Sequence, residues 1–273
     1  SKNRRFFDLR SPAVNDYIST RMTDFLAKNG FGYIKIDYND TYGVGCDGAE
    51  SLGEGGRQVA EESLAWLTKI KRAVPDMVIE NCSSGGSRIE PRRMNMVSMC
   101  SFSDAHECAE IPLVAANVSR VIPARQSQIW AVLREKDTPS RTIYSLCAAM
   151  LGRICLSGDV LNMPAEKIEL IRAGLAFYER VKPIVRNGEI TCIDCDVEYY
   201  RAPKGRQIYI KELGDQKLVI VHRLEGRGEI EIPAQGYALK EAYTDLKYTF
   251  GDTLRIADTG EYMAGAFLLE KRA

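Results

Sequence analysis

Apolar residues between positions 12 and 30 recur every three or four positions, which is the spacing of one face of an α-helix. They are Val14, Tyr17, Ile18, Met22, Phe25 and Leu26. Ser11 can cap such a helix, Pro12 suits its first turn, and Gly30 follows its last turn. The short apolar run from Tyr33 to Asp37 comes next, and it predicts a buried strand that ends on a charged residue.

The same alternation of strand and helix continues to about residue 181. The further predicted strands are 77–80, 97–102, 127–133 and 154–157, and the further predicted helices are 57–74, 111–121, 140–151 and 165–181. A stretch rich in glycine, residues 43–56, predicts a loop. Five strands that alternate with helices are typical of parallel βα units.

The pattern changes after Pro183 to short, often alternating runs separated by Gly and Asp. These runs are 198–201, 207–211, 217–222, 229–232 and 266–270. They predict antiparallel strands in a small β-sandwich. We therefore expect an α/β chain with two domains, 1–184 and 185–273, and a boundary near residues 184–189.

Five βα units are fewer than the eight of a closed βα barrel, and the chain opens with a helix that no strand precedes. A partial barrel exposes the edges of its strands and the inner side-chain layers. We expect either a missing N-terminal portion or a partner that supplies it, and we expect this chain alone to be inactive.

The charge balance excludes some classes of partner. Lys plus Arg and Asp plus Glu number 37 each, so the electrostatic basis for general binding to nucleic acid or to an anionic membrane is lacking. The sequence holds no apolar run close to the ~20 residues that span a bilayer, and no signal-peptide hydrophobic region follows Ser1. We expect no nucleic-acid partner and no membrane partner.

The eight cysteines are scattered over a large chain, unlike the dense framework of a small secreted domain. We interpret them as free thiols in a reducing compartment, which favours a cytoplasmic location. Cys192 and Cys195 form a CxxC pair, but no second pair or nearby histidine completes a zinc set. We therefore expect no metal site.

Polar residues follow three successive strands, at the ends that point into the active site of a βα barrel. Lys35, Asp37 and Asn39 alternate, so they share one face of an extended segment. The second strand leads into Glu80-Asn-Cys-Ser-Ser-Gly-Gly-Ser-Arg88, and the third into Ser103-Asp-Ala-His-Glu107. Simpler interpretations are a capping Asp37, an ordinary Gly-Gly turn, and a His106 that only donates or accepts hydrogen bonds.

Two carboxylates on different strand ends are what glycosidic cleavage needs. One attacks the anomeric carbon or activates water, and the other protonates the departing oxygen. Retaining enzymes hold the two carboxyl groups roughly 5–5.5 Å apart and inverting enzymes hold them farther apart, a distance that the sequence leaves open.

The three segments resemble those of glycoside hydrolase family 36 α-galactosidases. Tyr33-Ile-Lys-Ile-Asp-Tyr-Asn39 is similar to the YIKWDMN segment of that family, and Glu80 to Arg88 is similar to its ENCSSGGGRFD segment. Ser103-Asp104 is similar to its SDNTD segment, and the stretch from Phe7 to Tyr17 resembles its LDLTNPEVREYL segment. The resemblance covers residues 6–185, with the segments in the family's order.

The resemblance implies the C-terminal part of a (β/α)8 TIM barrel, from its third to its eighth helix, followed by the small antiparallel β-sandwich domain. It implies Asp37 as the nucleophile and Asp104 as the acid/base. Lys35 would bind galactose hydroxyls and keep Asp37 ionised. The other implied substrate-binding residues are Asn39, Cys82, Ser84, Gly85, Gly86 and Arg88. No cofactor is implied, and the full-length protein is expected to be a homo-oligomer.

The leading hypothesis is a retaining exo-α-galactosidase that releases terminal α-linked galactose from oligosaccharides or glycans through a covalent galactosyl-enzyme intermediate. Ile36, Tyr38 and Asp40 stand where the family typically has Trp, Met and Arg. An α-N-acetylgalactosaminidase with the same site therefore stays open. So do a transglycosylase and a non-catalytic carbohydrate-binding remnant of the barrel.

Overall fold

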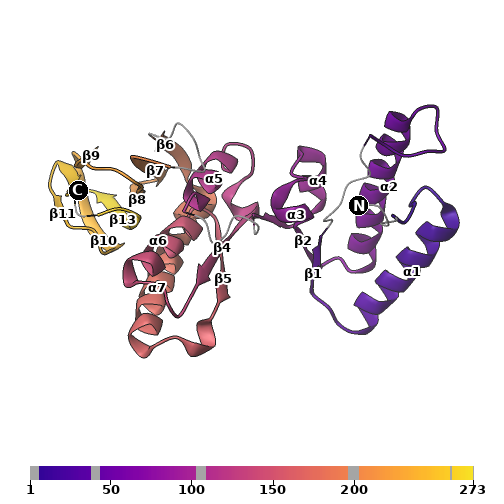
Figure 1. The fold of residues 1–273 in the computed structure, drawn as a ribbon, viewed down its shortest axis with the longest axis horizontal. Coiled ribbons are helices and arrows are strands. Elements are labelled where there is room, and N and C mark those ends of the chain that lie inside the picture. The colour runs from indigo at the N-terminus through magenta and orange to yellow at the C-terminus, as the bar shows by residue number, and fades with distance from the viewer. Residues whose placement is uncertain (1–5, 38–43, 103–108, 196–202, 259, 273) are drawn as a thin grey trace. The chain divides into compact units, whose positions relative to one another are not determined.

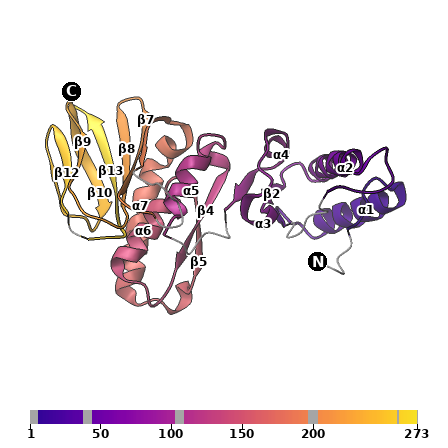
Figure 2. The same cartoon turned by 45° about the horizontal axis from the view of Figure 1, so that its top comes forward.

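The computed structural model describes residues 6–37, 44–102, 109–195, 203–258 and 260–272 of the chain. The chain divides into two compact units, Ser1–Ser101 and Phe102–Ala273, both drawn in Figures 1 and 2. Each unit is built on parallel strands with helices, and the second also carries antiparallel sheets. The predicted α/β class is confirmed, whereas the predicted division at residue 184 stays a prediction.

The first unit has three parallel strands and four helices in its described ranges. The strands are β1 (Tyr33–Ile36), β2 (Val78–Asn81) and β3 (Met99–Ser101), and the helices are α1 (Pro12–Lys28), α2 (Leu52–Ala73), α3 (Ser83–Gly86) and α4 (Pro91–Met96). Strand β2 lies between β1 and β3, with Lys35 opposite Glu80 and Asn81 opposite Cys100. Helices α1 and α2 lie side by side in both views (Figures 1 and 2).

Helix α1 has the predicted bounds, but its buried face differs from the predicted apolar face. The buried residues are Asn15, Ser19 and Leu26. Asn15 accepts a hydrogen bond from Lys69 Nζ of α2 at 2.5 Å, so a polar contact joins the two helices. Tyr17 and Phe25 of the predicted apolar face are 57% and 54% exposed.

Strand β1 is half exposed rather than buried, which corrects the prediction for this segment. Exposed and partly buried residues alternate along it, and Tyr33 is an exposed residue. The reason lies in its pairing, because β1 bonds to β2 along one edge and the described residues of this unit supply no strand for the other edge. Apolar composition alone therefore misjudged how much of the strand is covered.

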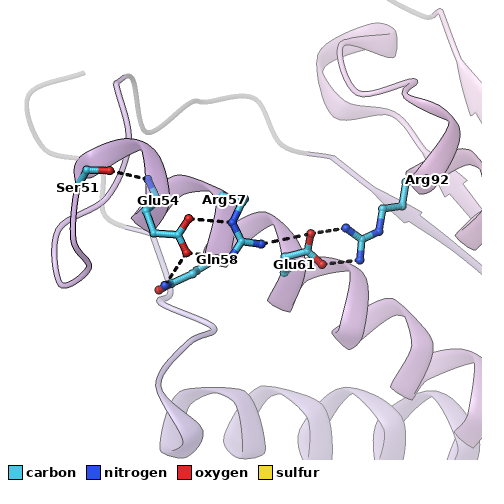
Figure 3. Close-up of polar contacts among 6 residues, drawn as sticks. All are labelled: Ser51, Glu54, Arg57, Gln58, Glu61 and Arg92. Atoms are coloured by element: carbon cyan, nitrogen blue, oxygen red, sulfur yellow. Dashed lines mark hydrogen bonds and ion pairs between the residues drawn. The ribbon is translucent and has the colours of Figure 1, made fainter.

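Helix α2 begins at Leu52, five residues before the predicted start at Arg57. Ser51 is its N-cap, and the Ser51 hydroxyl accepts a hydrogen bond from the Glu54 amide at 3.1 Å (Figure 3). The carboxylate of Glu54 in turn accepts hydrogen bonds from Arg57 and Gln58. A capping residue and first-turn acid therefore start the helix inside the glycine-rich stretch.

Charged side chains on the surface of α2 also join this helix to α4. Glu61 lies between Arg57 of its own helix and Arg92 of α4, and it forms ion pairs with both (Figure 3). Hydrogen bonds from Arg57 and then Gln58 lower the pKa of Glu54 to about 2. The hydrogen bonds of Glu54 therefore stabilise the first turns of α2 at the protein surface.

The second unit begins with the βα pattern and ends with antiparallel strands. Its helices are α5 (Ile111–Val118), η2 (Ala124–Gln126), α6 (Pro139–Ala149), η3 (Val160–Asn162) and α7 (Ala165–Asn187). Its strands are β4 (Ser127–Leu133), β5 (Arg153–Gly158), β6 (Glu189–Cys195), β7 (Arg206–Leu213), β8 (Gln216–Arg223), β9 (Ile230–Pro233), β10 (Tyr237–Thr244), β11 (Tyr248–Phe250), β12 (Thr253–Ile256) and β13 (Met263–Lys271). Strands β4 and β5 are parallel, as predicted.

The antiparallel strands form two sheets, in the orders β10-β13-β8-β7-β6 and β11-β12-β9. Buried apolar side chains of both sheets form one core, and they include Ile208, Val219, Ile232, Leu254 and Phe267. On the other face of the larger sheet, Gln207 and Lys211 point toward the helices and donate hydrogen bonds to the carbonyls of Pro112 and Val185. Figure 2 shows α6 and α7 against this sheet.

Helix α7 continues six residues beyond the predicted end at Val181, through Pro183 to Asn187. Proline costs the helix one backbone hydrogen bond. Ile184 and Val185 are buried immediately after it, and the Gly188 amide bonds to the Ile184 carbonyl at 2.8 Å. Burial of this last turn therefore holds the helix together past the proline.

Strands β6, β10, β11 and β12 were not predicted, and the predicted strand at 198–201 falls outside the described residues. All seven cysteines of the described part are free thiols, including Cys192 and Cys195. None of the helices in the described ranges is long and apolar enough to cross a membrane.

Candidate functional site

The predicted nucleophile, Asp37, directly follows β1 and is exposed. Its Oδ1 accepts a hydrogen bond from the backbone amide of Ser84 at 3.0 Å. Ser84 belongs to the turn that follows β2, so the contact joins the carboxyl ends of two neighbouring parallel strands. An amide donor favours the ionised form of a carboxylate and fixes its orientation.

The turn after β2 has an uncommon backbone that aims this amide. Ser83, Ser84 and Gly85 have φ angles of 50°, 58° and 70°, all in the left-handed region. Non-glycine residues are strained in this conformation, and such strain is concentrated at functional sites. The Gly86 amide closes the turn on the Cys82 carbonyl at 2.7 Å.

The side chain of Asn81 holds the turn through two hydrogen bonds. Its Oδ1 accepts a hydrogen bond from the Ser83 hydroxyl at 2.8 Å, and its Nδ2 donates to the Arg88 carbonyl at 2.7 Å. Asn81 is buried. Both the oxygen and the nitrogen of this buried side-chain amide make hydrogen bonds, and we call this pair of bonds the Asn81 clamp. The clamp holds the turn in one conformation.

Lys35 lies on β1 two residues before Asp37 and opposite Glu80 of β2. Its Nζ lies 3.3 Å from Glu80 Oε1. The hydroxyl of Tyr33 donates a hydrogen bond to Glu80 Oε2. Tyr33 and Lys35 therefore hold the same buried carboxylate from alternate positions of one strand.

The pair is ionised. Burial lowers the pKa of Lys35, but the charge of Glu80 and contact with Cys82 outweigh it, so the net pKa is raised. Burial raises the pKa of Glu80, but the hydrogen bond from Tyr33 and the charge of Lys35 outweigh it, so the net pKa is lowered. A positive charge therefore stands two residues before the predicted nucleophile.

The structure brings some of the predicted site residues together, and two others fall outside its described ranges. Lys35, Asp37, Cys82 and Ser84 cluster at the ends of β1 and β2, with Gly85 and Gly86 in the same turn. Cys82 is buried, and it contacts Lys35. Asp104 and Asn39 lie outside the described residues.

Arg88 follows the same turn, and its backbone carbonyl accepts the hydrogen bond from Asn81. It lines a cavity of about 650 Å³ together with Phe6, Arg10, Trp66 and Arg93. Neither Lys35 nor Asp37 belongs to the residues that line the cavity. The predicted contact between Arg88 and the sugar stays a prediction.

Sequence reasoning missed the supporting roles of Tyr33, Glu80 and Asn81. A usable signal exists, because Tyr33 and Lys35 alternate on one strand and therefore share a face. The partner strand could not be aligned from the sequence, so Glu80 could not be placed opposite Lys35. Within the described ranges, no group of three or more His, Cys, Asp or Glu side chains could hold a metal ion.

Comparisons with known proteins show the family and the fold of the chain. The family model described as Melibiase matches residues 1–188. Alpha-galactosidase 2 of Pediococcus pentosaceus is 24% identical over 273 residues, covering 96% of this chain and 36% of that protein. Probable alpha-galactosidase C of Aspergillus terreus is 23% identical over 245 residues, covering 85% of this chain and 30% of that protein. The chain thus spans about a third of the length of these relatives.

Among solved structures, the GH36 α-galactosidase AgaA of Geobacillus stearothermophilus in complex with 1-deoxygalactonojirimycin has a TM-score of 0.81 and 17% identity. The match covers 97% of this chain and 39% of AgaA. Other structures of AgaA variants are complexes with raffinose and with stachyose. At this identity the likeness shows a shared fold.

Proposed function

The chain belongs to the Melibiase family, and from that premise we propose that it carries the catalytic carboxylates of a retaining exo-α-galactosidase. Its substrates would be oligosaccharides or glycans with a terminal α-linked galactose. The relatives are named α-galactosidases, and AgaA is found in complex with raffinose and stachyose, which supports this class of substrate.

The reaction has two displacements. An Asp37 oxygen attacks the anomeric carbon while the bond to the glycosidic oxygen breaks, and Asp104 gives its proton to that oxygen. Asp104 then takes a proton from water, whose oxygen attacks the anomeric carbon and releases Asp37. Two inversions give net retention, and galactose leaves as the α-anomer.

The observation that carries the proposal is the anchoring of Asp37. One oxygen of the carboxylate holds the Ser84 amide at 3.0 Å, which fixes the side chain at the exposed end of β1. Lys35, charged and two residues away, favours the ionised nucleophile and offers donors to sugar hydroxyls. A nucleophile must be ionised and oriented, and both conditions have a physical cause here.

Asp37→Ala in the full-length protein tests the assignment. We expect kcat for nitrophenyl α-galactoside to fall on the order of a thousandfold or more, because the covalent step loses its nucleophile. Asp16→Ala, which removes an exposed carboxylate of α1, is the matched control and should keep the wild-type rate. Turnover by Asp37→Ala at the wild-type rate would refute the proposed nucleophile.

Two further measurements decide the finer points. Proton NMR of the first-formed sugar should show α-galactose, and β-galactose as the first product would exclude retention. Nitrophenyl α-galactoside should be preferred over its N-acetylgalactosamine analogue, and the opposite preference would replace the galactose assignment. The cytoplasmic location and the homo-oligomeric state remain predictions from the sequence and the resemblance.

A further inference from the structure

Glu80 carries a charged carboxylate in the buried interior of the first unit. It is 2% exposed, in the middle of β2. A buried carboxylate is costly unless it is paired and hydrogen-bonded. Two of its partners, Tyr33 and Lys35, belong to β1, the strand that leads to Asp37. Ser101 of β3 also acts on the carboxylate through a hydrogen bond that lowers its pKa.

We propose that Glu80 is a positioning residue for the proposed reaction, which holds the ammonium of Lys35 at the sugar-binding end of β1. This inference rests on the proposed function and adds a residue to it. Glu80 has no contact with the substrate. It acts through Lys35, whose Nζ lies 3.3 Å from the Glu80 carboxylate.

The need for such a residue follows from the exposure of Lys35. Its side chain is 32% exposed, at a strand that is paired along one edge. A free lysine side chain samples many rotamers, with ~2 kcal/mol of rotamer entropy to lose when it is fixed. A carboxylate directly opposite in the parallel register selects the rotamers that keep the ammonium against β2. The lysine is then already in place when a sugar binds.

The carboxylate is itself held in place. The Tyr33 hydroxyl donates to one oxygen of Glu80, which leaves the other oxygen directed at Lys35. The buried thiol of Cys82 is the second contact of the Lys35 ammonium. Tyr33 therefore helps to fix the position of Glu80, and Glu80 in turn fixes the position of the Lys35 ammonium.

A double-mutant cycle separates positioning from a merely structural role. Glu80→Gln keeps the size of the side chain and removes its charge, and Lys35→Met removes the ammonium. In the full-length protein we expect Glu80→Gln to lower kcat/KM for nitrophenyl α-galactoside roughly tenfold, the worth of one charge-assisted hydrogen bond. In the Lys35→Met background the same change should cost less than about twofold, because nothing is left to position.

Two outcomes overturn the proposal. One is a Glu80→Gln protein with wild-type kcat/KM. The other is an equal loss from Glu80→Gln with and without Lys35, which would mean that the glutamate acts through the fold. Tyr33→Phe is the matched control, because it removes the hydrogen bond from Tyr33 to Glu80 and leaves the ion pair, so its loss should be smaller than that of Glu80→Gln. If Glu80→Gln does not fold, Glu80→Asp takes its place in the cycle, with the charge drawn back by one methylene.

A readout that needs no turnover distinguishes failure of this inference from failure of the proposed function. The pH dependence of Lys35 modification by an amine reagent, followed by peptide mass spectrometry, reports the pKa of Lys35. Glu80→Gln should lower that pKa, since burial then acts without the opposing carboxylate. If Glu80→Gln lowers the pKa of Lys35 while the wild-type protein cleaves no α-galactoside, the proposed function is refuted and the ion pair is kept. An unchanged pKa in an active enzyme would refute the inference and keep the function.

Discussion

The backbone amide of Ser84 donates a hydrogen bond to Asp37 Oδ1 at 3.0 Å, from a residue whose φ angle is 58°. A right-handed turn would place this amide elsewhere, so the bond depends on the left-handed backbone of the turn after β2. The conformation costs free energy at a serine, and the Asn81 clamp helps to hold it. The strained turn after β2 thus places the Ser84 amide as a fixed hydrogen-bond donor to the Asp37 carboxylate.

Ser84→Gly should be more stable than Ser84→Ala by about 1 kcal/mol, because both lose the hydroxyl and only alanine keeps the Cβ that disfavours positive φ. Urea unfolding of the two variants measures the difference. At Ser87, which has φ of −71° at the end of the same short helix, the order should reverse, since glycine there only adds backbone freedom. Equal stabilities for the two Ser84 variants would mean that the serine is not strained.

Gly55→Ala should destabilise the protein by more than ~2 kcal/mol, although alanine favours helix by ~1 kcal/mol over glycine. A Cβ at Gly55 would come within 2.0 Å of the Cys46 carbonyl oxygen, so α2 and the preceding segment would have to separate. Denaturant unfolding reports the loss.

Gly53→Ala is the matched control in the same turn of α2. The nearest atom to its added Cβ is Ser51 Oγ at 3.9 Å, which leaves room for a methyl group. Its helix propensity then acts alone, and we expect a gain of about 0.5–1 kcal/mol. A similar effect of both substitutions would contradict the close approach of Gly55 to Cys46.

Much of the fold could be predicted from local patterns. Strand β4 and helix α1 have the predicted bounds because clear periodicity and end signals mark them. The start of α2 was missed because three glycines within its first turns argue for a loop, while one cap hydrogen bond at Ser51 and the close approach at Gly55 decide otherwise. The strands β10 to β12 were missed because their pairing, rather than their composition, defines them.

The position of Asp37 could be predicted from the sequence, but the contacts that support it could not. Its place after a strand singled out Asp37, and the resemblance implied its role as nucleophile, which stays a prediction. The structure gives Asp37 a hydrogen-bond partner in Ser84. No sequence pattern shows that Ser83 and Ser84 adopt positive φ, because tertiary contacts such as the Asn81 clamp impose it. Glu80 begins the second polar segment of the sequence, but only the strand register places it opposite Lys35.

Ser51→Ala should destabilise the protein by about 1 kcal/mol, since the amide of Glu54 would lose its side-chain acceptor at the start of α2. Ser11→Ala is the control at the start of α1. Ser11 occupies the N-cap position, but its side chain makes no cap hydrogen bond, so the loss should be only a few tenths of a kcal/mol. Thermal unfolding of both variants measures the two losses of stability. Equal losses would show that the hydrogen bond to the Ser51 hydroxyl does not stabilise the protein.

His222 gives the second unit a pH dependence of its own. It is fully buried on β8, and its ring meets the Tyr144 ring edge to face at a centroid distance of 4.9 Å. Neither ring nitrogen has a hydrogen-bond partner within the described part of the chain. Burial lowers the pKa of His222 from 6.5 to about 3, so the folded protein keeps this histidine neutral well into the acid range.

The unfolded chain binds a proton at His222 below about pH 6.5, while the folded chain does not until about pH 3. The free energy of unfolding therefore falls by roughly 1.4 kcal/mol per pH unit from this residue alone as the pH drops through that window. His222→Leu removes the titration and two unpartnered nitrogens, so it should be about as stable as wild type near neutral pH and more stable by about 2–3 kcal/mol near pH 4.5. Urea unfolding of both proteins at the two pH values isolates this contribution, because every other titrating group is common to them. A stability difference that does not change with pH would show that His222 takes up its proton over the same pH range in the folded and unfolded protein.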